Sequence, residues 1–310
     1  MRRLRSFFDE RGFLEVCTPL LSADTVVDRH LDPLCVTLFH DPRRPHEGRR
    51  LYLQTSPEFH MKRLLASGGQ AIYQVTQAFR GAESGVLHNP EFTIAEWYRC
   101  GDTMSEGIQL LDDLCDALLE RGSAQRISYG HAFCEHLGID PHRCETSQLA
   151  AMAQSIGLVR SPHGTTGDQR EDRDTLLNLL LAERVQPHLG KVRPTILYHY
   201  PASQAALAHT RDETPPVAER FELFVDGVEL ANGSHELLDP KQLQLRNAMT
   251  NRQRQLEGKP SLPENSRLLQ AMQHGLPPCT GVALGFDRLV MLCAGDKQLE
   301  KVLAFPIELA

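Results

Sequence analysis

Apolar and polar residues alternate in two pairs of short segments, and a polar turn separates the members of each pair. The first pair is 72–79 and 92–98, around a glycine-containing loop, and the second is 222–225 and 228–231, around Asp226-Gly227. Alternation with a period of two is typical of strands, and Asp-Gly is a strong signal for a two-residue hairpin turn. The pattern therefore predicts two antiparallel hairpins.

Helical periodicity is clearest at the start of the chain. Leu4, Phe7 and Phe8 share one face of a helix over 1–11, and Gly12 follows where a helix commonly ends on glycine. Further strands are expected at 13–21 (with Pro19), 34–39, 51–54, 195–200 and 281–285, and further helices at 56–65 and 105–119, from Asp239-Pro240 to near Gly258, and from Asp287 onward. Hairpins mixed with helices predict an α+β fold rather than regular βαβ units.

The segment 122–190 contains no chemical motif, and we interpret it as a mostly helical insertion. Within it, 161–173 is polar and is expected to be a loop. The chain shows no internal repeat. Its 310 residues are enough for one large domain or two modest ones, and a hydrophobic content of 41% is enough for a substantial core.

Composition and apolar runs indicate the cellular compartment of the protein. The chain has no apolar run near the ~20 residues needed to cross a bilayer, and its basic N-terminus is not followed by an apolar signal region. We therefore expect a cytoplasmic protein with no membrane contact. The eight cysteines form no CxxC pair and no compact Cys/His cluster, so free thiols are expected and a zinc site is not.

The net charge of −7 argues against a protein that grips long RNA. One local basic cluster stands out, at Arg43, Arg44, Arg49 and Arg50. A solvated loop is the simpler interpretation, and contact with an acidic partner is the alternative.

The loop of the first predicted hairpin and the strand after it contain several side chains that can bind or activate a substrate. Phe79-Arg80-Gly81-Ala82-Glu83 opens it, His88 and Phe92 follow, and Glu96 lies further along the second strand. An arginine can bind phosphate, a ring can stack on a base, and carboxylates can hold an ammonium group. This combination favours a site that activates an amino acid with ATP.

The second predicted hairpin places two carboxylates together. With Asp226-Gly227 as the turn, Phe224 pairs with Glu229, and Glu222 shares their face of the sheet. Mg²⁺ bridging nucleotide phosphates would neutralise the two glutamates, although two solvated glutamates are the simpler interpretation of this hairpin alone. We expect Asn232-Gly233-Ser234 to be a polar turn that ends the strand. Glu236, beyond it, would hold a substrate ammonium or lie on the surface.

Closely spaced glycines precede an arginine near the C-terminus. Gly281 and Gly285 flank 282–284, and Arg288 follows at the start of a predicted helix. Such glycines let a ligand approach the backbone, and the arginine can meet phosphate or stack on a base. Close packing is the usual explanation of a lone GxxxG pattern.

Taken in order, these segments resemble the three motifs of class II aminoacyl-tRNA synthetases. The segment 12–16 with Pro19 is similar to motif 1, the segment from Phe79-Arg80 onward to motif 2, and 281–288 to motif 3. Ser56-Pro57-Glu58, His88-Asn89-Pro90-Glu91-Phe92-Thr93 and Glu229-Leu230-Ala231-Asn232-Gly233 resemble the lysyl-tRNA synthetase branch. The resemblance covers nearly the whole chain except 122–190. It implies an antiparallel sheet flanked by helices and a single catalytic domain over 1–310.

The resemblance also implies roles for individual residues. Arg80 would bridge the substrate carboxylate and the α-phosphate, and Phe92 and Arg288 would sandwich the adenine. The catalytic pair would be Arg80 and Arg288. The remaining ATP contacts would be Gly81, Ala82, Glu83, His88, Glu229, Leu230 and Gly285. The amino acid would be bound by Ser56, Pro57, Glu58, Glu96, Tyr98, Asn232, Glu236 and Ala283. Glu222 and Glu229 would hold Mg²⁺.

Within the family the chain is most similar to the truncated branch that modifies elongation factor P with (R)-β-lysine. Met1 lies in the helix just before motif 1, so we expect no anticodon-binding domain and no tRNA substrate. Trp97 and Ala283 stand where synthetases usually have an aliphatic residue and a glycine, and the added methyl of Ala283 would reshape the pocket by ~1–3 kcal/mol. Motif 1 implies a homodimer. A stand-alone lysine-activating enzyme with another acceptor, and an inactive regulatory paralogue, are the alternatives.

One position departs from the motif 2 pattern. The family usually has Arg-x-Glu, with the glutamate on the adenine amino group, whereas here Ala82 occupies that place and Glu83 follows one residue later. A neutral hydrogen bond of this kind contributes about 0.5–1.5 kcal/mol. We therefore expect weaker ATP binding at worst, not loss of activity.

Overall fold

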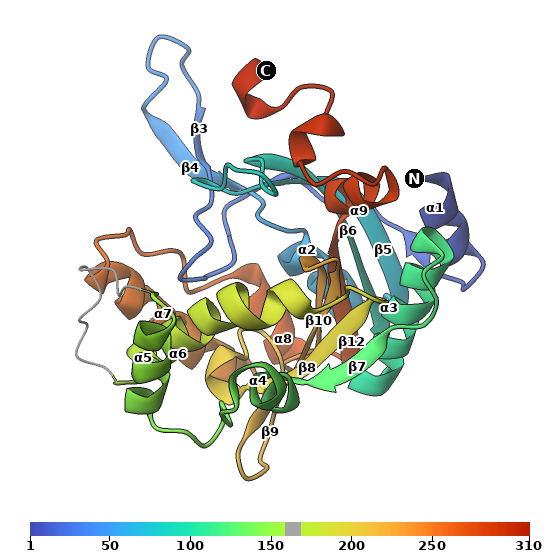
Figure 1. Ribbon diagram of the computed structural model, residues 1–310. Coiled ribbons are helices and arrows are strands. Elements are labelled where there is room, and N and C mark those ends of the chain that lie inside the picture. Colours follow the sequence, from blue (N-terminus) through green and yellow to red (C-terminus); the bar gives the residue numbers. More distant parts are fainter. Residues whose placement is uncertain (159–168) are drawn as a thin grey trace. The chain divides into compact units, whose positions relative to one another are not determined.

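The computed structural model describes residues 1–158 and 169–310 (Figure 1). The chain forms two compact units: unit 1 comprises Met1–Thr103 and Leu238–Ala310, and unit 2 comprises Met104–Leu237. Both units combine helices with mostly antiparallel sheet, which confirms the predicted α+β class. Among the described residues, no helix is both long enough and apolar enough to span a bilayer.

Unit 1 is built on four strands in the order β1-β5-β6-β12. The long hairpin β5–β6 and the pair β6–β12 are antiparallel, and the short β1 is parallel to β5. These strands are β1 (Leu14–Glu15), β5 (Ala71–Phe79), β6 (Glu91–Cys100) and β12 (Cys279–Gly285), and the helices of the unit are α1 (Arg2–Asp9), α2 (Glu58–Ala66), α7 (Pro240–Leu256), α8 (Arg267–His274) and α9 (Phe286–Cys293). The first predicted hairpin is therefore confirmed.

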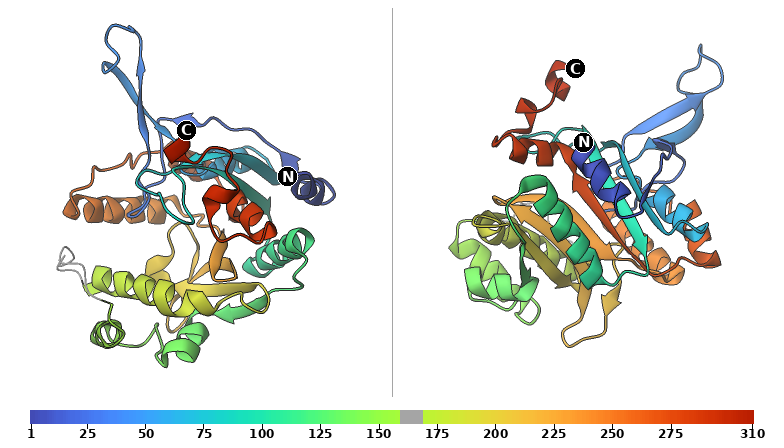
Figure 2. Two further views of the ribbon diagram at one scale, coloured as in Figure 1. Left: turned by 45° about the horizontal axis from the view of Figure 1, so that its top comes forward. Right: turned by 90° about the vertical axis from the view of Figure 1, so that its right-hand side faces the viewer.

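A second, smaller sheet of unit 1 has the order β2-β4-β3. Its strands are β2 (Leu21–Ser22), β3 (Cys35–Phe39) and β4 (Gly48–Leu53). The β3–β4 hairpin projects from the rest of the unit in the views of Figures 1 and 2 and carries the basic cluster near its tip. Leu38 and Phe39 are 46% and 44% exposed there.

An aromatic cluster holds α1 on the sheet of unit 1. Phe8 is fully buried, stacks on Tyr73 with ring centroids 4.6 Å apart, and contacts Phe13 and Trp97 at 5.1 and 5.2 Å. Leu4 and Phe7 are buried beside it, as the helical period predicts. Trp97 therefore packs into the core beneath α1.

Unit 2 has its own sheet, in the order β11-β10-β8-β7 with β9 paired to β10. The strands are β7 (Gln125–Ser128), β8 (Thr195–Pro201), β9 (Thr210–Arg211), β10 (Val217–Val225) and β11 (Val228–His235), and the helices are α3 (Met104–Leu119), α4 (Tyr129–Leu137), α5 (Thr146–Ser155) and α6 (Gln169–Leu180). Phe224 of β10 belongs to an apolar core shared with α4, α5 and α6. The equally buried Leu223 points to the other face, because side chains alternate along a strand.

The second predicted hairpin is also confirmed, including its register. Asp226 and Gly227 have φ angles of 55° and 83°, as a tight primed turn requires, and Phe224 pairs with Glu229. Leu223 pairs with Ala231, which leaves Leu230 as an extra residue in a bulge. Glu222 consequently lies opposite Asn232.

Three sequence predictions are wrong in detail. The strand expected at 13–21 is only two short strands, β1 and β2, in different sheets, because Pro19 has no N–H for a continuous ladder. The polar turn expected at 232–234 does not form, because these residues pair with β10 and continue β11 to His235. Of the loop expected at 161–173, the residues from Gln169 onward belong to α6, and 161–168 lie outside the described residues.

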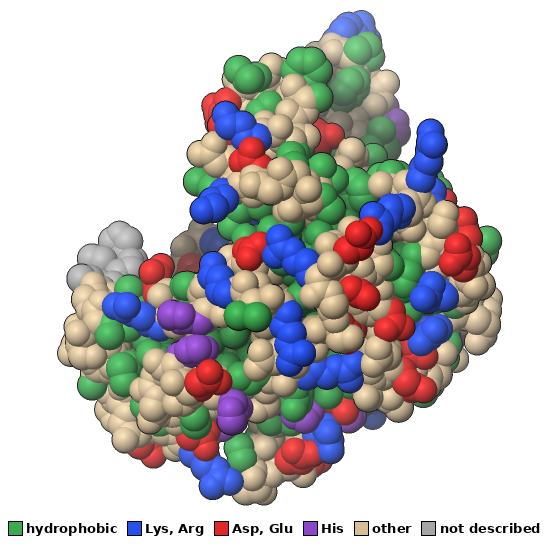
Figure 3. Space-filling view, turned by 45° about the vertical axis from the view of Figure 1, so that its right-hand side comes forward, with side chains coloured by type: hydrophobic (Ala, Val, Ile, Leu, Met, Phe, Trp, Pro, Cys, Tyr) green, Lys and Arg blue, Asp and Glu red, His purple; other side chains and the backbone are tan. Residues whose placement is uncertain are grey.

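Charged side chains are intermixed on the surface. On the face that Figure 3 shows, lysines and arginines alternate with aspartates and glutamates. All eight cysteines lie in the described part of the chain and are free thiols, as the sequence predicts.

Candidate active site

Arg80 lies at the end of β5, where the first hairpin opens into its loop. Its backbone N–H donates to the Pro90 carbonyl at 2.9 Å, which closes the hairpin. Its guanidinium lies 5.0 Å from the centroid of the Phe92 ring and donates to the Thr55 carbonyl at 3.4 Å. Glu83 approaches it at 3.8 Å. The structure thus places the predicted phosphate arginine directly beside the predicted adenine-stacking ring.

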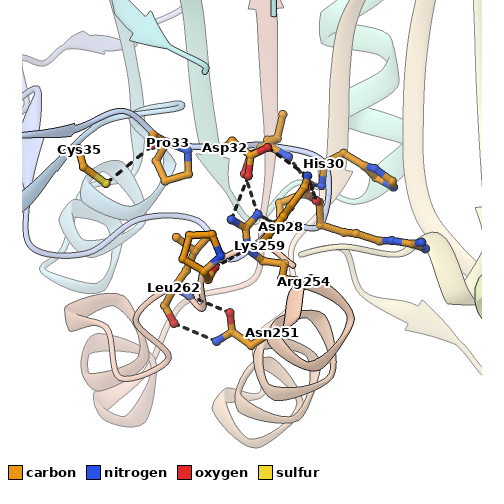
Figure 4. A network of polar contacts seen from close by, with 12 residues as sticks. Asp28, His30, Asp32, Pro33, Cys35, Asn251, Arg254, Lys259 and Leu262 are labelled. Carbon is orange, nitrogen blue, oxygen red and sulfur yellow. Dashed lines mark hydrogen bonds and ion pairs between the residues drawn. The ribbon is translucent and has the colours of Figure 1, made fainter. Parts of the chain in front are cut away.

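The backbone after Arg80 is held by a network of polar side chains around Asp32, Arg254 and Lys259, which lie far from Arg80 in the sequence. Figure 4 shows these three residues. The Gly81 N–H donates to the Asp32 carbonyl at 2.7 Å. The Asp32 carboxylate in turn contacts Arg254 at 2.9 Å and Lys259 at 3.0 Å. Lys259 also donates to the Arg29 carbonyl. Through the Asp32 carbonyl, this network holds the start of the motif 2 loop in place.

Arg254 is the centre of this network and is only 1% exposed. Besides the ion pair with Asp32, it donates hydrogen bonds to three backbone carbonyls, of Asp28 at 2.8 Å, Leu31 at 3.3 Å and Pro260 at 3.1 Å. Sequence reasoning missed Arg254, because an arginine in a polar helix has no visible partner until the fold brings 28–32 against the end of α7.

The loop of the first hairpin closes tightly. Gly85 and His88 exchange two backbone hydrogen bonds, of 3.0 and 3.2 Å. Ala82, the residue that replaces the usual glutamate, has a φ of 62° in the left-handed region. The altered motif therefore forms a defined turn with Glu83 directed toward Arg80.

Arg288, at the start of α9, meets the same loop. Its Nη2 lies 2.8 Å from His88 Nε2, and its Nε donates to the Leu87 carbonyl at 3.2 Å. The neighbouring Asp287 accepts a hydrogen bond from the Thr93 N–H at 2.7 Å, which fixes α9 to β6. Burial raises the pKa of Asp287, and hydrogen bonds from Thr93 oppose this rise. The nearest atoms to a methyl group added at Gly285 would be those of the Arg288 side chain, at 3.5–3.7 Å.

Of the residues predicted to bind the amino acid, unit 1 holds Glu58 at the start of α2, Glu96 and Tyr98 on β6, and Ala283 on β12. Tyr98 donates its hydroxyl to Glu96 at 2.7 Å, and both side chains are buried. Ala283 of β12 pairs with Glu96, and Gly281 pairs with Tyr98. Small residues on β12 thus line up beside the two polar side chains of β6.

Glu58 begins α2 and has a partner that sequence reasoning missed. Lys62, one turn later, is 2% exposed and forms an ion pair with Glu58 at 2.5 Å. Its ammonium also lies 5.9 Å from the Tyr98 ring. The Glu58 N–H donates to the Ser56 hydroxyl at 3.2 Å. The i,i+4 spacing within a predicted helix was the available signal for this pair.

In unit 2, Glu222 is the centre of a buried polar cluster. It accepts hydrogen bonds from Tyr200 and Arg220, both at 2.5 Å, and from the Asn232 amide at 3.0 Å. Burial, with a smaller contribution from the nearby charge of Glu229, raises the pKa of Glu222 to about 7 against the opposing effects of Arg220 and Tyr200. The effect of Glu229 indicates that Glu222 and Glu229 lie near each other, as the hairpin register predicts.

Glu236 follows directly after β11 and is buried rather than on the surface. The Ser234 hydroxyl donates to it at 3.2 Å, and its backbone bridges to Ala208. The contacts of unit 1 thus join Ser56 to Glu58, Arg80 to Phe92, Glu96 to Tyr98 and Ala283, and Arg288 to His88. In unit 2, Glu222 is bonded to Asn232 and lies near Glu229, and Glu236 follows the same strand as Asn232.

The fold and these motifs define the chain as a class II synthetase. Residues 1–309 match the family model described as class II tRNA synthetases (D, K and N), and the chain belongs to this family. It is an enzyme of the ligase class.

The chain is also similar to curated relatives over its whole length. It is 48% identical to the elongation factor P–(R)-β-lysine ligase of Edwardsiella ictaluri over 307 residues, which are 99% of this chain and 92% of that protein. It is 47% identical to the proteins of the same name from Klebsiella pneumoniae (100% of this chain, 93% of that protein) and Yersinia enterocolitica (99% and 92%).

Proposed function

We propose that this chain activates (R)-β-lysine with ATP and transfers it to a lysine side chain of elongation factor P. The observation that carries this proposal is the 47–48% identity to ligases of that name over 99–100% of the chain. In unit 1, the contacts of Arg80, Phe92, His88 and Arg288 support the ATP-dependent half of the reaction.

In the first step, a carboxylate oxygen of the amino acid attacks the α-phosphorus of ATP. A new oxygen–phosphorus bond forms, the bond to the β-phosphate oxygen breaks, and pyrophosphate leaves. Such chemistry requires alignment and charge neutralisation more than acid–base groups. Arg80 would hold carboxylate and α-phosphate together, because its planar fork suits both. In the second step, the acceptor lysine amine attacks the acyl carbon and forms a carbon–nitrogen bond. The acyl carbon–oxygen bond to AMP breaks, AMP leaves, and the amine nitrogen loses a proton to solvent.

The proposed nucleotide contacts follow from the resemblance to class II synthetases. Phe92 and Arg288 would enclose the adenine, which requires Arg80 to move from the Phe92 ring onto the phosphates. His88 would reach the terminal phosphate from its contact with Arg288. Further ATP contacts are assigned to Gly81, Ala82, Glu83, Glu229, Leu230 and Gly285.

The amino acid would be held by carboxylates at its two amino groups. Glu58 would bind the amine near the carboxylate, with Lys62 fixing the orientation of its side chain through their ion pair. Glu96 and Tyr98 would bind the distal ammonium, and Ala283 would restrict the pocket beside them. Ser56, Pro57, Asn232 and Glu236 complete the proposed set.

A Mg²⁺ ion fits the donor set of the β10–β11 hairpin. Glu222 and Glu229 offer the oxygen ligands that this ion prefers, and a dication would offset their mutual repulsion. Glu222 and Glu229 would hold the ion, and it would neutralise phosphate charge. We further propose a homodimer, a single catalytic domain, a cytoplasmic location and no tRNA substrate.

ATP–pyrophosphate exchange tests the first step. Purified protein should exchange pyrophosphate much faster with (R)-β-lysine than with α-L-lysine, and mass spectrometry should then show one β-lysyl addition on elongation factor P. Arg80→Ala should abolish exchange, whereas Arg49→Ala, in the exposed β3–β4 hairpin, should leave it unchanged. Preference for α-lysine would favour a lysine-activating enzyme with another acceptor, and no exchange with either amino acid would favour an inactive paralogue.

A further inference from the structure

Three potential metal ligands from separate segments of unit 2 meet beside β10. His209 precedes β9, Glu219 lies on β10 and His235 ends β11. His209 Nδ1 lies 3.1 Å from Glu219 Oε2, and His235 Nδ1 contacts the same oxygen. The ligand atoms of all three residues lie within 4.8 Å of one another. The sequence concealed this cluster, because its members are spaced ten and sixteen residues apart.

The backbone holds the three residues in place independently of their side chains. The His209 N–H donates to the His235 carbonyl at 2.8 Å, and the Glu219 N–H donates to the His209 carbonyl at 2.9 Å. Pairing of β9 with β10 and of β10 with β11 continues on either side. The three side chains therefore start from fixed positions, which lowers the entropy lost when they bind a common ion.

The donor set suits a borderline-soft cation such as Zn²⁺. Two imidazole nitrogens and one carboxylate oxygen are among the ligand sets known for zinc, whereas Mg²⁺ prefers oxygen alone. Tetrahedral ligands at the usual zinc distances lie about 3.3 Å apart, close to the 3.1 Å between His209 Nδ1 and Glu219 Oε2. Glu219 is 14% exposed and His209 47% exposed, so one side of the cluster is open to a water or an external ligand.

Arg211 carries a positive charge close to the cluster. Arg211 Nε is 3.9 Å from the other oxygen of Glu219, Oε1, but its Nη2 is paired with Glu213 at 2.5 Å. Glu219 Oε2, which both histidines contact, is the oxygen that would bind the ion. Arg211 thus leaves the metal-facing oxygen accessible while Glu213 offsets its charge.

We propose that His209, Glu219 and His235 form a binding site for a divalent transition-metal ion, with Zn²⁺ as the best match to its donors. These are not the residues proposed for Mg²⁺, and they carry none of the contacts to ATP or to the amino acid. A bound ion would cross-link β9, β10 and β11.

Zinc titration of four proteins by isothermal calorimetry tests this site. The proteins are the tag-free wild type, His209→Ala, Glu219→Gln and a control, His136→Ala/His188→Ala. The control removes two histidines of the same unit whose rings stack at 4.8 Å outside the cluster. His209→Ala keeps its backbone hydrogen bonds and removes a half-exposed ring, so it should fold, as circular dichroism will verify.

The wild type and the control should each bind one Zn²⁺ per chain. Loss of an outer-shell partner alone typically weakens metal binding 10–100-fold, so His209→Ala and Glu219→Gln, which lose a direct ligand, should bind about 100-fold more weakly. X-ray absorption should show nitrogen and oxygen ligands at about 2.0–2.2 Å and no sulfur at about 2.3 Å. Equal affinity in all four proteins, no binding by the wild type, or sulfur ligation by the free cysteines would overturn the proposal.

Discussion

Replacing Arg254 with methionine should destabilise unit 1 and slow ATP–pyrophosphate exchange. The change keeps most of the side-chain volume but removes a guanidinium that is 1% exposed and bound to the carbonyls of Asp28, Leu31 and Pro260. It also removes one of the two cations that hold Asp32. Asp32 in turn accepts the Gly81 N–H, next to Arg80, so the effect should reach the motif 2 loop.

The expected loss in the free energy of unfolding depends on how far each lost contact is exposed to solvent. The Asp32 side chain is 33% exposed and keeps Lys259, so its ion pair with Arg254 contributes little more than a surface pair, about 0–1 kcal/mol. The carbonyls lose their charged donor, and each such hydrogen bond is worth about 1.5–3 kcal/mol without strict additivity. Because these hydrogen bonds are not additive, we expect the free energy of unfolding to fall by about 3–5 kcal/mol, less than three separate charged hydrogen bonds would contribute.

Urea unfolding and exchange kinetics measure the two effects separately. Arg252→Met is the matched control, because it alters an exposed arginine on the same helix and should change stability by less than about 0.5 kcal/mol. The exchange rate is compared at a temperature where all proteins remain folded. If Arg254→Met unfolds at the same urea concentration as Arg252→Met, the carbonyl bonds do not stabilise the fold. If it is less stable but exchanges at the wild-type rate, the network does not position Arg80.

Two further perturbations probe the core and the same network. Phe8→Ala should lower the free energy of unfolding by about 3–5 kcal/mol, because it empties a fully buried site between Tyr73 and Trp97. The control is Phe305→Ala, which alters a side chain that is 75% exposed. Equal urea midpoints for the two variants would contradict a stabilising role for the aromatic cluster around Phe8. Burial raises the pKa of Asp32, but Lys259 and Arg254 outweigh it and hold this pKa below the ordinary 3.8. Ionised Asp32 therefore contributes stability above pH 3.8 that is lost as the pH falls through the lower folded pKa. Asp32→Asn should therefore make the free energy of unfolding less dependent on pH in acid. An unchanged dependence would show that Asp32 is not paired with Lys259 and Arg254.

Both hairpins and two of the helices could be predicted from the sequence directly. Period-two alternation and the Asp226-Gly227 turn predicted both hairpins, and the structure confirms the pairing of Phe224 with Glu229. Apolar spacing predicted α1 and its buried face, and Asp239-Pro240 predicted the start of α7, where the Asp239 side chain accepts the Lys241 N–H at 2.8 Å. These signals are local, because each depends on residues within a few positions of one another.

Other features could not be read from the chain, because they depend on which segments pack together. No local signal distinguishes the buried Arg254 from the exposed Arg252, and its partners at 28–32 lie more than two hundred positions away. The continuation of β11 through Asn232-Gly233-Ser234 was missed for the same reason, since a polar, glycine-containing segment becomes a strand only when β10 supplies its hydrogen-bond partners.

The sequence by itself determined the class of enzyme and the types of side chain present in its motifs, because motifs keep order and spacing along one chain. Tertiary structure alone decided which of those side chains are buried, which are paired, and which unrelated residues support them. Asp32 behind Gly81 and the cluster of His209, Glu219 and His235 are of this kind. Burial and long-range hydrogen bonding set these arrangements, and both arise only when distant segments exclude water from each other.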